Sequence, residues 1–219
     1  DGSSASAAID SDWHHVVITD TAGVDPSAFD IGRVSSEYFA GTLDQTRIYN
    51  RILTQDEISE LYRLGSRKLQ VNTPSDQFMA GGLISYWSFD GSAMDWGSST
   101  AEVLDLSGNG NHGDVQNGAQ AARGRLGQGL EFDGDNDAVL VGGGVLPISG
   151  DLTLCSWLKK EENDGFVAGR WGSGGSYSYK LSYNRFSVSS DGSYGAVSDV
   201  SLASTSEDYG KGVRVPFRE

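Results

Sequence analysis

The stretch FAGTLDQTRIYNRILTQDEISELY, residues 39–62, joins a strand-like run to a short amphipathic helix. Thr54 is a good N-cap, and Glu57 follows it three residues later, which makes a capping box. Apolar residues recur after the cap at helical spacing, and Gly65 has the character of a C-terminal stop. The spacing therefore predicts one short helix, at about 54–64, that caps a domain.

The sequence around this helix is typical of short strands joined by tight turns. Thirty glycines, with Asx-Gly pairs such as Asp90-Gly91 and Asn117-Gly118, supply the turns. Strand-like runs lie between the turns, at 13–19, 83–89, 129–132, 138–141, 152–158 and 177–183. Because apolar faces of sheets must be buried, we expect an all-β fold, an antiparallel two-sheet sandwich with the single helix.

Composition excludes several classes of function. Sixteen Lys and Arg against thirty Asp and Glu give a net charge of −14, which repels phosphate backbones, so we expect no nucleic acid partner. The longest apolar run is far below the roughly 20 residues of a membrane span, so we expect no membrane insertion. Cys155 is the single cysteine, so neither an internal disulfide nor a zinc cluster can form around it.

Two groups of motifs carry a resemblance to a known family. Segment 83–158 contains LISYWSFDG, DLSGNGNHGDV, GQGLEFDGDNDAVLV and LTLCSWLK, in this order. Segment 12–64 contains DWHHVVI, FDIGR and the stretch quoted above. The first segment resembles the opening half, and the second the closing half, of a laminin-G-like, concanavalin-A-like jelly roll of bacterial extracellular type. The resemblance covers more than half of the chain and implies an antiparallel two-sheet jelly-roll sandwich.

The order of the two halves is reversed relative to that family. We assign the chain to four parts: 1–66 as the closing half, 67–81 as a linker, 82–203 as the opening half, and 204–219 as a tail of unknown role. Three explanations are open. The chain is a circularly permuted sandwich completed in cis, a piece of a tandem array, or a subunit completed in trans by its neighbours.

Edge-strand physics restricts these explanations. A half-sandwich exposes unpaired backbone groups and an apolar face, which makes it unstable and prone to aggregation. We therefore expect 12–64 and 82–200 to share a sheet, within one molecule or between neighbours.

The loop DLSGNGNHG, which begins at Asp105, is the best candidate for a metal site. Asp105, Asn109 and Asn111 supply hard oxygen ligands of the kind that Ca²⁺ prefers, and His112 offers its backbone carbonyl. In the family this loop is associated with a calcium site near the closing strand. The resemblance therefore implies Asp44 as the partner carboxylate and Ca²⁺ as a structural cofactor. The alternative is an Asx-type turn that binds nothing.

An acidic strand raises the alternative of a glycan hydrolase. Glu131 and Asp133 are one strand period apart and face the same side, as the carboxylates of some glycosidases do. The third acid of the related glucanase pattern is missing, because position 136 is Asn136. We interpret 133–137 as a hairpin turn and expect no catalytic residues.

Aromatic residues provide candidates for a glycan-binding surface, because sugars stack their C–H faces on exposed rings. The candidates are Trp96, Trp171, Tyr177 and Tyr179. Trp96 lies in a loop-like run and is the best candidate for exposure. Tyr177 and Tyr179 share a strand face by parity, which fits either a binding platform or a wall of the core.

The resemblance and the missing catalytic set imply a non-catalytic recognition or adhesion module, extracellular or at the cell surface. We expect calcium to stabilise it, and glycans or other cell-surface components to be its partners. The main alternative is a structural subunit of an extracellular filament or surface assembly, completed by strand exchange between subunits. A glycan hydrolase is the third hypothesis.

Overall fold

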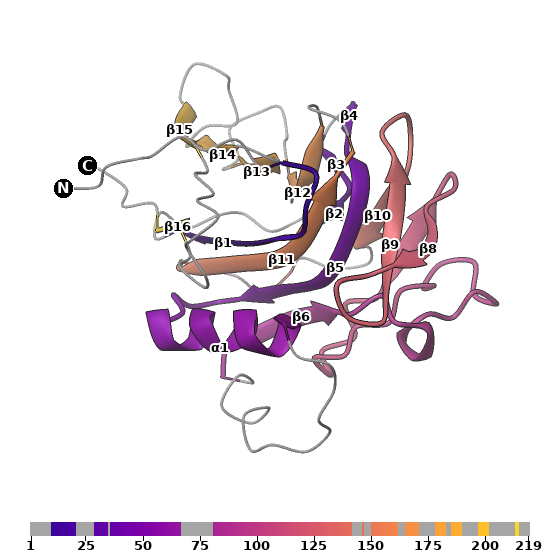
Figure 1. Cartoon of the computed structure of the whole chain (residues 1–219), viewed down its shortest axis with the longest axis horizontal. Coiled ribbons are helices and arrows are strands. Elements are labelled where there is room, and N and C mark those ends of the chain that lie inside the picture. Colours follow the sequence, from indigo (N-terminus) through magenta and orange to yellow (C-terminus); the bar gives the residue numbers. More distant parts are fainter. Residues whose placement is uncertain are drawn as a thin grey trace.

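The described part of the chain forms two seven-stranded sheets, a small hairpin and one α-helix (Figure 1). The structure is a computed structural model that describes residues 10–20, 29–34, 36–66, 81–141, 146, 150–161, 165–170, 178–182, 185–189, 197–201 and 213–214. Strands dominate and nearly all pairings are antiparallel, which confirms the all-β prediction with a single short helix. No helix among these residues is long and apolar enough to cross a membrane.

The first sheet has the strand order β16-β1-β11-β5-β9-β8, and β6 also pairs with β5. Its strands are β16 (Val213–Arg214), β1 (His14–Asp20), β11 (Leu152–Lys160), β5 (Ala40–Tyr49), β9 (Gln128–Asp133), β8 (Gln120–Arg123) and β6 (Leu83–Trp87). The pairing of β16 with β1 is parallel and places a short segment of the C-terminal tail at the edge of this sheet.

The second sheet has the strand order β15-β14-β13-β12-β2-β10-β7. Its strands are β15 (Val197–Ser201), β14 (Arg185–Ser189), β13 (Ser178–Ser182), β12 (Phe166–Arg170), β2 (Phe29–Ile31), β10 (Ala138–Val141) and β7 (Gly113–Gln116). Next to it lies the hairpin of β3 (Arg33–Val34) and β4 (Glu37–Tyr38). A single 3₁₀ turn, η1 (Gly91–Ala93), follows β6.

Both sheets mix strands from the two parts of the chain. Strand β1 pairs with β11 over seven positions, from His14 opposite Leu158 to Asp20 opposite Leu152. Strand β5 pairs with β11, β9 and β6, and β2 lies between β10 and β12. Strands from 12–64 and 82–200 therefore share both sheets within a single chain, which is the arrangement of the first of the three explanations.

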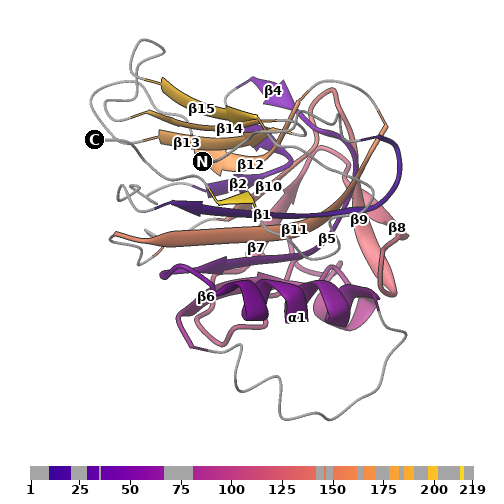
Figure 2. The same ribbon diagram turned by 60° about the vertical axis from the view of Figure 1, so that its left-hand side comes forward.

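The two sheets pack face to face over one hydrophobic core (Figure 2). Inward residues of the first sheet, such as Ile18 and Leu130, join residues of the second, such as Ile31 and Val139, in the same buried cluster. The Trp87 ring stacks on the ring of Phe29, in β2 of the facing sheet, with the two ring centroids 5.9 Å apart. Burial of this many large apolar side chains is the main stabilising contribution to a sandwich.

Helix α1 (Gln55–Ser66) covers the outer face of the first sheet, as the layers in Figure 2 show. The predicted capping box forms: the Thr54 N–H donates to Glu57 Oε2 at 2.7 Å, and the Glu57 N–H donates to Thr54 Oγ1 at 3.3 Å. Glu57 also accepts two hydrogen bonds from the Arg51 guanidinium, which lowers the pKa of Glu57 to about 2. The helix start is therefore fixed to the end of β5.

Gly65 does not end the helix, contrary to the prediction, because the helix continues to Ser66. The glycine serves close packing instead. A Cβ at this position would overlap the indole of Trp157, which projects from β11 toward the helix. Glycine is favoured both at the C-terminal end of a helix and where two elements pack closely. The sequence alone therefore does not show which of these two roles Gly65 has.

Two predicted turns connect the two sheets, so the prediction of a hairpin at 133–137 is wrong. The Asn117-Gly118 turn leads from β7 in the second sheet to β8 in the first. The turn at 133–137 leads from β9 in the first sheet to β10 in the second. The turn residues determine that the chain reverses direction, but they do not determine whether the strands before and after the turn pair with each other. The proposed linker falls almost wholly outside the described residues.

Gly65→Ala tests the packing of α1 on the sheet. Alanine is the better helix former by about 1 kcal/mol, but the overlap with Trp157 costs about 1–3 kcal/mol, as overpacking commonly does. We expect a net loss in the free energy of unfolding, measured by urea denaturation. Arg63→Ala, on the exposed face of the same helix, is the control and should change stability by no more than about 0.5 kcal/mol. A Gly65→Ala protein more stable than wild type would contradict this account.

Candidate functional site

The carboxylate of Asp105 is fully engaged by donors of the protein itself. Its Oδ1 accepts hydrogen bonds from the N–H groups of Tyr86 and Ser107, both at 2.9 Å. Its Oδ2 accepts from the Ser107 hydroxyl at 2.8 Å and from the Asn111 N–H at 3.0 Å. This is the geometry of the Asx-type turn that the sequence left open as an alternative.

The two asparagines predicted as ligands in this loop bind to the neighbouring strand β6, and His112 binds within the loop. The side-chain amides of Asn109 and Asn111 both donate to the Ile84 carbonyl at 2.9 Å. The Asn111 carbonyl accepts from the Trp87 indole at 2.8 Å. The His112 ring accepts from the Asp105 N–H through Nδ1 at 3.0 Å. The loop that begins at Asp105 thus provides hydrogen-bond partners for backbone groups of β6 that are not paired with β5.

Asp44 has a different environment, in the middle of β5. Its side chain is completely buried, and its Oδ2 accepts a hydrogen bond from the Leu126 N–H at 2.8 Å. Its Oδ1 is buried and accepts no hydrogen bond of good geometry, although the backbone N–H groups of Gln45 and Arg125 interact with the carboxyl and partly offset the rise in its pKa. Burial raises the pKa of the Asp44 carboxyl to about 7, and the negative charge of Asp90 adds to this shift. A buried acceptor oxygen without a well-aligned donor is costly in this position and leaves room for a further ligand.

Asp90 and Asp44 hold the same loop between β8 and β9. Asp90 Oδ1 accepts from the Gln128 N–H at 2.9 Å. A Cβ at Gly124 would lie 2.7 Å from Asp44 Oδ2, and one at Gly127 would overlap Asp90 Oδ1. Both glycines are therefore required for the loop backbone to approach the two carboxylates closely. We name Asp44, Asp90 and the loop 124–128 the Asp44 site.

The structure does not bring Asp44 and Asp105 together as one metal site. The contacts of Asp105 lie along β6, whereas those of Asp44 lie in the loop 124–128. Sequence reasoning missed Asp90 and this loop. The sequence does contain one signal for this loop. Gly124 and Gly127 precede a strand but form no turn dipeptide, which indicates that they serve close packing rather than a tight turn. Among the described residues no three His, Cys, Asp or Glu side chains form a metal-binding group, so a cation at the Asp44 site would need backbone oxygens or water as well.

Of the two acidic residues of β9, Glu131 and Asp133, Asp133 has a structural role because it holds the turn that follows. Asp133 Oδ1 accepts hydrogen bonds from the N–H groups of Asp135, Asn136 and Asp137, at 2.9, 3.2 and 3.4 Å. These bonds fix the turn and lower the pKa of Asp133. Glu131 lies on β9, opposite Thr42 of β5.

The aromatic candidates are only partly covered by the structure. Trp96 lies in a turn and is 50% exposed, which agrees with the expectation for this residue. Trp171 and Tyr177 lie outside the described residues. The backbone of Tyr179 belongs to β13, opposite Arg170 of β12 and Val188 of β14, and its side chain is outside the description. Of these four positions, the described residues include the side chain of Trp96 alone, so the predicted glycan-binding surface stays a prediction.

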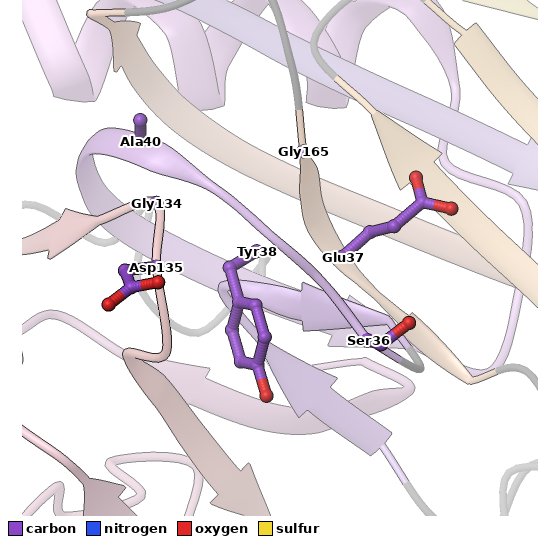
Figure 3. Close-up of a pocket in the computed structure, with 7 residues that line it drawn as sticks. All are labelled: Ser36, Glu37, Tyr38, Ala40, Gly134, Asp135 and Gly165. Atoms are coloured by element: carbon purple, nitrogen blue, oxygen red, sulfur yellow. The ribbon is translucent and has the colours of Figure 1, made fainter.

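A pocket with a volume of about 270 Å³ lies at the β3–β4 hairpin (Figure 3). Its walls come from the hairpin, from the turn after β9 and from the residue that precedes β12. They are formed by Ser36, Glu37, Tyr38, Ala40, Gly134, Asp135 and Gly165. Gly134 and Asp135 belong to the stretch 133–137, which the sequence led us to interpret as a turn, so the sequence did not predict a pocket here.

Comparison with known proteins adds no assignment: no family model, no curated protein and no solved structure matches the chain. The laminin-G-like resemblance therefore stays a prediction that rests on the quoted motifs.

The raised pKa of Asp44 predicts a pH dependence of stability in the cation-free protein. Below its ordinary pKa of 3.8 the carboxyl is neutral in both the folded and the unfolded chain. Between 3.8 and about 7 the unfolded chain loses the proton that the folded protein keeps. The free energy of unfolding should therefore fall as pH rises through this window, by on the order of 2–4 kcal/mol from this group.

Asp44→Asn isolates this contribution, because an amide oxygen still accepts the Leu126 N–H. Denaturation in chelator across the window should show a shallower fall for Asp44→Asn than for wild type. Asp151→Asn, an exposed position at the start of β11, is the charge-matched control. Equal pH slopes for wild type and Asp44→Asn would contradict the buried, protonated state of Asp44.

Proposed function

We propose that this chain is a non-catalytic recognition or adhesion module of the extracellular, laminin-G-like type, stabilised by calcium and directed at glycans or other cell-surface components. The single observation that carries the calcium part is Asp44 Oδ1, a buried oxygen without a well-aligned donor, in a carboxyl whose pKa the negative charge of Asp90 also raises. The extracellular setting and the ligand class are supported by the motif resemblance and the acidic composition.

The Asp44 site suits a hard divalent cation. Calcium takes six to eight oxygen ligands and readily uses backbone carbonyls together with one or two carboxylates. A cation beside Asp44 and Asp90 would remove their mutual repulsion and favour the ionised form of Asp44 at neutral pH. This proposal moves the calcium from the Asp105 loop to the Asp44 site, because the oxygens of Asp105 already accept four hydrogen bonds.

The position of the site gives the cation a structural role. Asp44 belongs to the segment 1–66, whereas Asp90 and the loop 124–128 belong to 82–203. A cation bound between them would connect the two parts of the chain in addition to the β5 ladders. It would therefore stabilise the folded state in proportion to its occupancy.

Assembly by strand exchange is the alternative function, and the structure offers it less support. Within the same chain, β5 pairs with three strands, and β1 pairs with β11 over seven positions. Neither half needs a neighbouring subunit to satisfy these backbone groups, so we propose the recognition module first.

Calcium titration tests the metal proposal. At a pH above the pKa of Asp44, calcium should raise the melting temperature of wild type, equivalent to about 2.7 kcal/mol when its concentration is about 100 times Kd. Asp44→Asn and Asp90→Asn should lose this increment. Asp105→Asn should lower stability and keep the increment, because its oxygens support β6. An increment that survives in Asp44→Asn, or disappears in Asp105→Asn, would contradict the Asp44 site.

A glycan array with the calcium-loaded protein tests the recognition role. We expect selective binding to a subset of glycans, confirmed by calorimetry, with no release of reducing ends on prolonged incubation. Glu131→Gln is the control for hydrolysis. Cleavage that disappears in this variant would replace the proposal by the hydrolase hypothesis, and an array without any bound glycan would remove the glycan part.

A further inference from the structure

The sequence contains two Asn-Gly steps, Asn109-Gly110 and Asn117-Gly118. Such steps are chemically labile, because the nitrogen of the following residue can attack the asparagine side chain and expel its amide nitrogen. Glycine at the second position favours the attack, since it has no Cβ to hinder the approach and its backbone turns freely. The two steps have the same local chemistry, so any difference between them in the folded protein comes from their surroundings.

The side chain of Asn109 is held by three hydrogen bonds. Its Nδ2 donates to the carbonyls of Leu83 and Ile84 in β6, at 3.1 and 2.9 Å. It also donates to the hydroxyl of Ser107 at 3.1 Å. Attack on the Asn109 side chain requires that this amide leave all three acceptors, which ties the reaction to opening of the loop from β6.

The side chain of Asn117 is held much less firmly. Among the described residues it makes one hydrogen bond, from Nδ2 to the Asn136 carbonyl at 2.7 Å, and both Asn117 and Gly118 are exposed. The backbone of Asn117 has a φ of +65°, and the Gly118 N–H donates to the Gln116 carbonyl at 2.9 Å. A three-residue turn with a positive φ at its centre is strained, so this turn opens at low cost.

The position of this turn in the fold adds to its freedom. It joins β7 to β8, and each of these strands lies at the end of its sheet and pairs with a strand on one side only. Segments with few bonds to the rest of the protein open locally without global unfolding. Opening of the turn breaks the bond between Gly118 and Gln116 and frees the Gly118 nitrogen to react.

We propose that Asn117 is a site of spontaneous deamidation in the folded protein, whereas Asn109 is protected. The Gly118 nitrogen forms a bond to Cγ of Asn117, the bond from Cγ to Nδ2 breaks, and the Gly118 amide proton leaves with Nδ2 as ammonia. Water then opens the resulting succinimide ring. Hydrolysis at the side-chain carbonyl leaves an aspartate, and hydrolysis at the backbone carbonyl leaves an isoaspartate, whose extra methylene lies in the main chain.

The product is poorly suited to its surroundings. Deamidation replaces a donor to the Asn136 carbonyl by a carboxylate oxygen, which repels that carbonyl. Asp137 lies next to this carbonyl in the chain, and its Oδ1 is buried and accepts no hydrogen bond. Burial and the charges of Asp133 and Asp135 already raise the pKa of Asp137. A further negative charge beside this turn therefore weakens the connection between the two sheets.

The experiment follows both Asn-Gly steps in one sample. The protein is incubated at neutral pH, folded or unfolded in guanidinium, and the modified fraction at each step is measured over time by peptide mapping and mass spectrometry. In the folded protein, Asn117 should react at least about tenfold faster than Asn109, which must break two further hydrogen bonds. In the unfolded chain neither side chain is held, so the two rates should be similar.

Two variants complete the test. Asn117→Gly tolerates the positive φ and has no side-chain amide, so it should abolish modification at this step and leave the rate at Asn109 unchanged. Asn117→Asp carries the charge of the aspartate product. Its urea midpoint should lie below those of wild type and Asn117→Gly, and the difference should shrink at high salt, because salt screens repulsion between charges.

Three results would overturn the inference. In the folded protein these are a rate at Asn109 equal to or above that at Asn117, and no modification of Asn117 within the time that modifies the unfolded chain. The third is a urea midpoint of Asn117→Asp equal to that of wild type, which would remove the proposed effect on stability. The inference does not depend on the recognition role, so the result of the glycan array leaves it unchanged.

Discussion

The fold depends on the backbone ladders of β5, a ten-residue strand whose partners all come from the other part of the chain. Without β11, β9 and β6, this strand would expose unpaired N–H and C=O groups and two faces that are buried in the folded protein, which is unfavourable in water. The pairing of β1 with β11 extends the same constraint to the start of the chain. The two parts of the chain, 12–64 and 82–200, are each stabilised because these ladders close within one molecule.

The Asp44 site is a consequence of the same strand. Asp44 lies in β5 near a register shift in the ladder with β11, and it holds the loop that leads into β9. Its buried oxygen without a well-aligned donor is tolerated because the carboxyl keeps a proton up to a pKa of about 7. Ionisation without a cation would then oppose folding, whereas ionisation with a bound cation would favour it.

Local features were predictable from the sequence and long-range ones were not. The capping box of Thr54 and Glu57 is encoded within four residues, and the helix begins where it predicts. Strand content followed from alternation and turn residues. The role of Gly65 depends on the side chain of Trp157 in β11, and the electrostatic effect of Asp90 on Asp44 depends on tertiary pairing. The Asp105 loop shows the converse, since the amides of a ligand-like spacing donate hydrogen bonds to a backbone carbonyl of β6, a contact that spacing alone does not predict.

Completion of the sandwich within one chain is tested most directly by a distance measurement between its two parts. Spin labels at Glu37→Cys and Asp135→Cys would report on one pocket from 1–66 and from 82–203, while the buried Cys155 stays unlabelled. The labelled protein is refolded with an excess of unlabelled chain and measured by dipolar electron paramagnetic resonance. We predict a short intramolecular distance whose amplitude is unchanged by the excess. Loss of that coupling on dilution with unlabelled chain would show that the halves pair between molecules and would contradict the account.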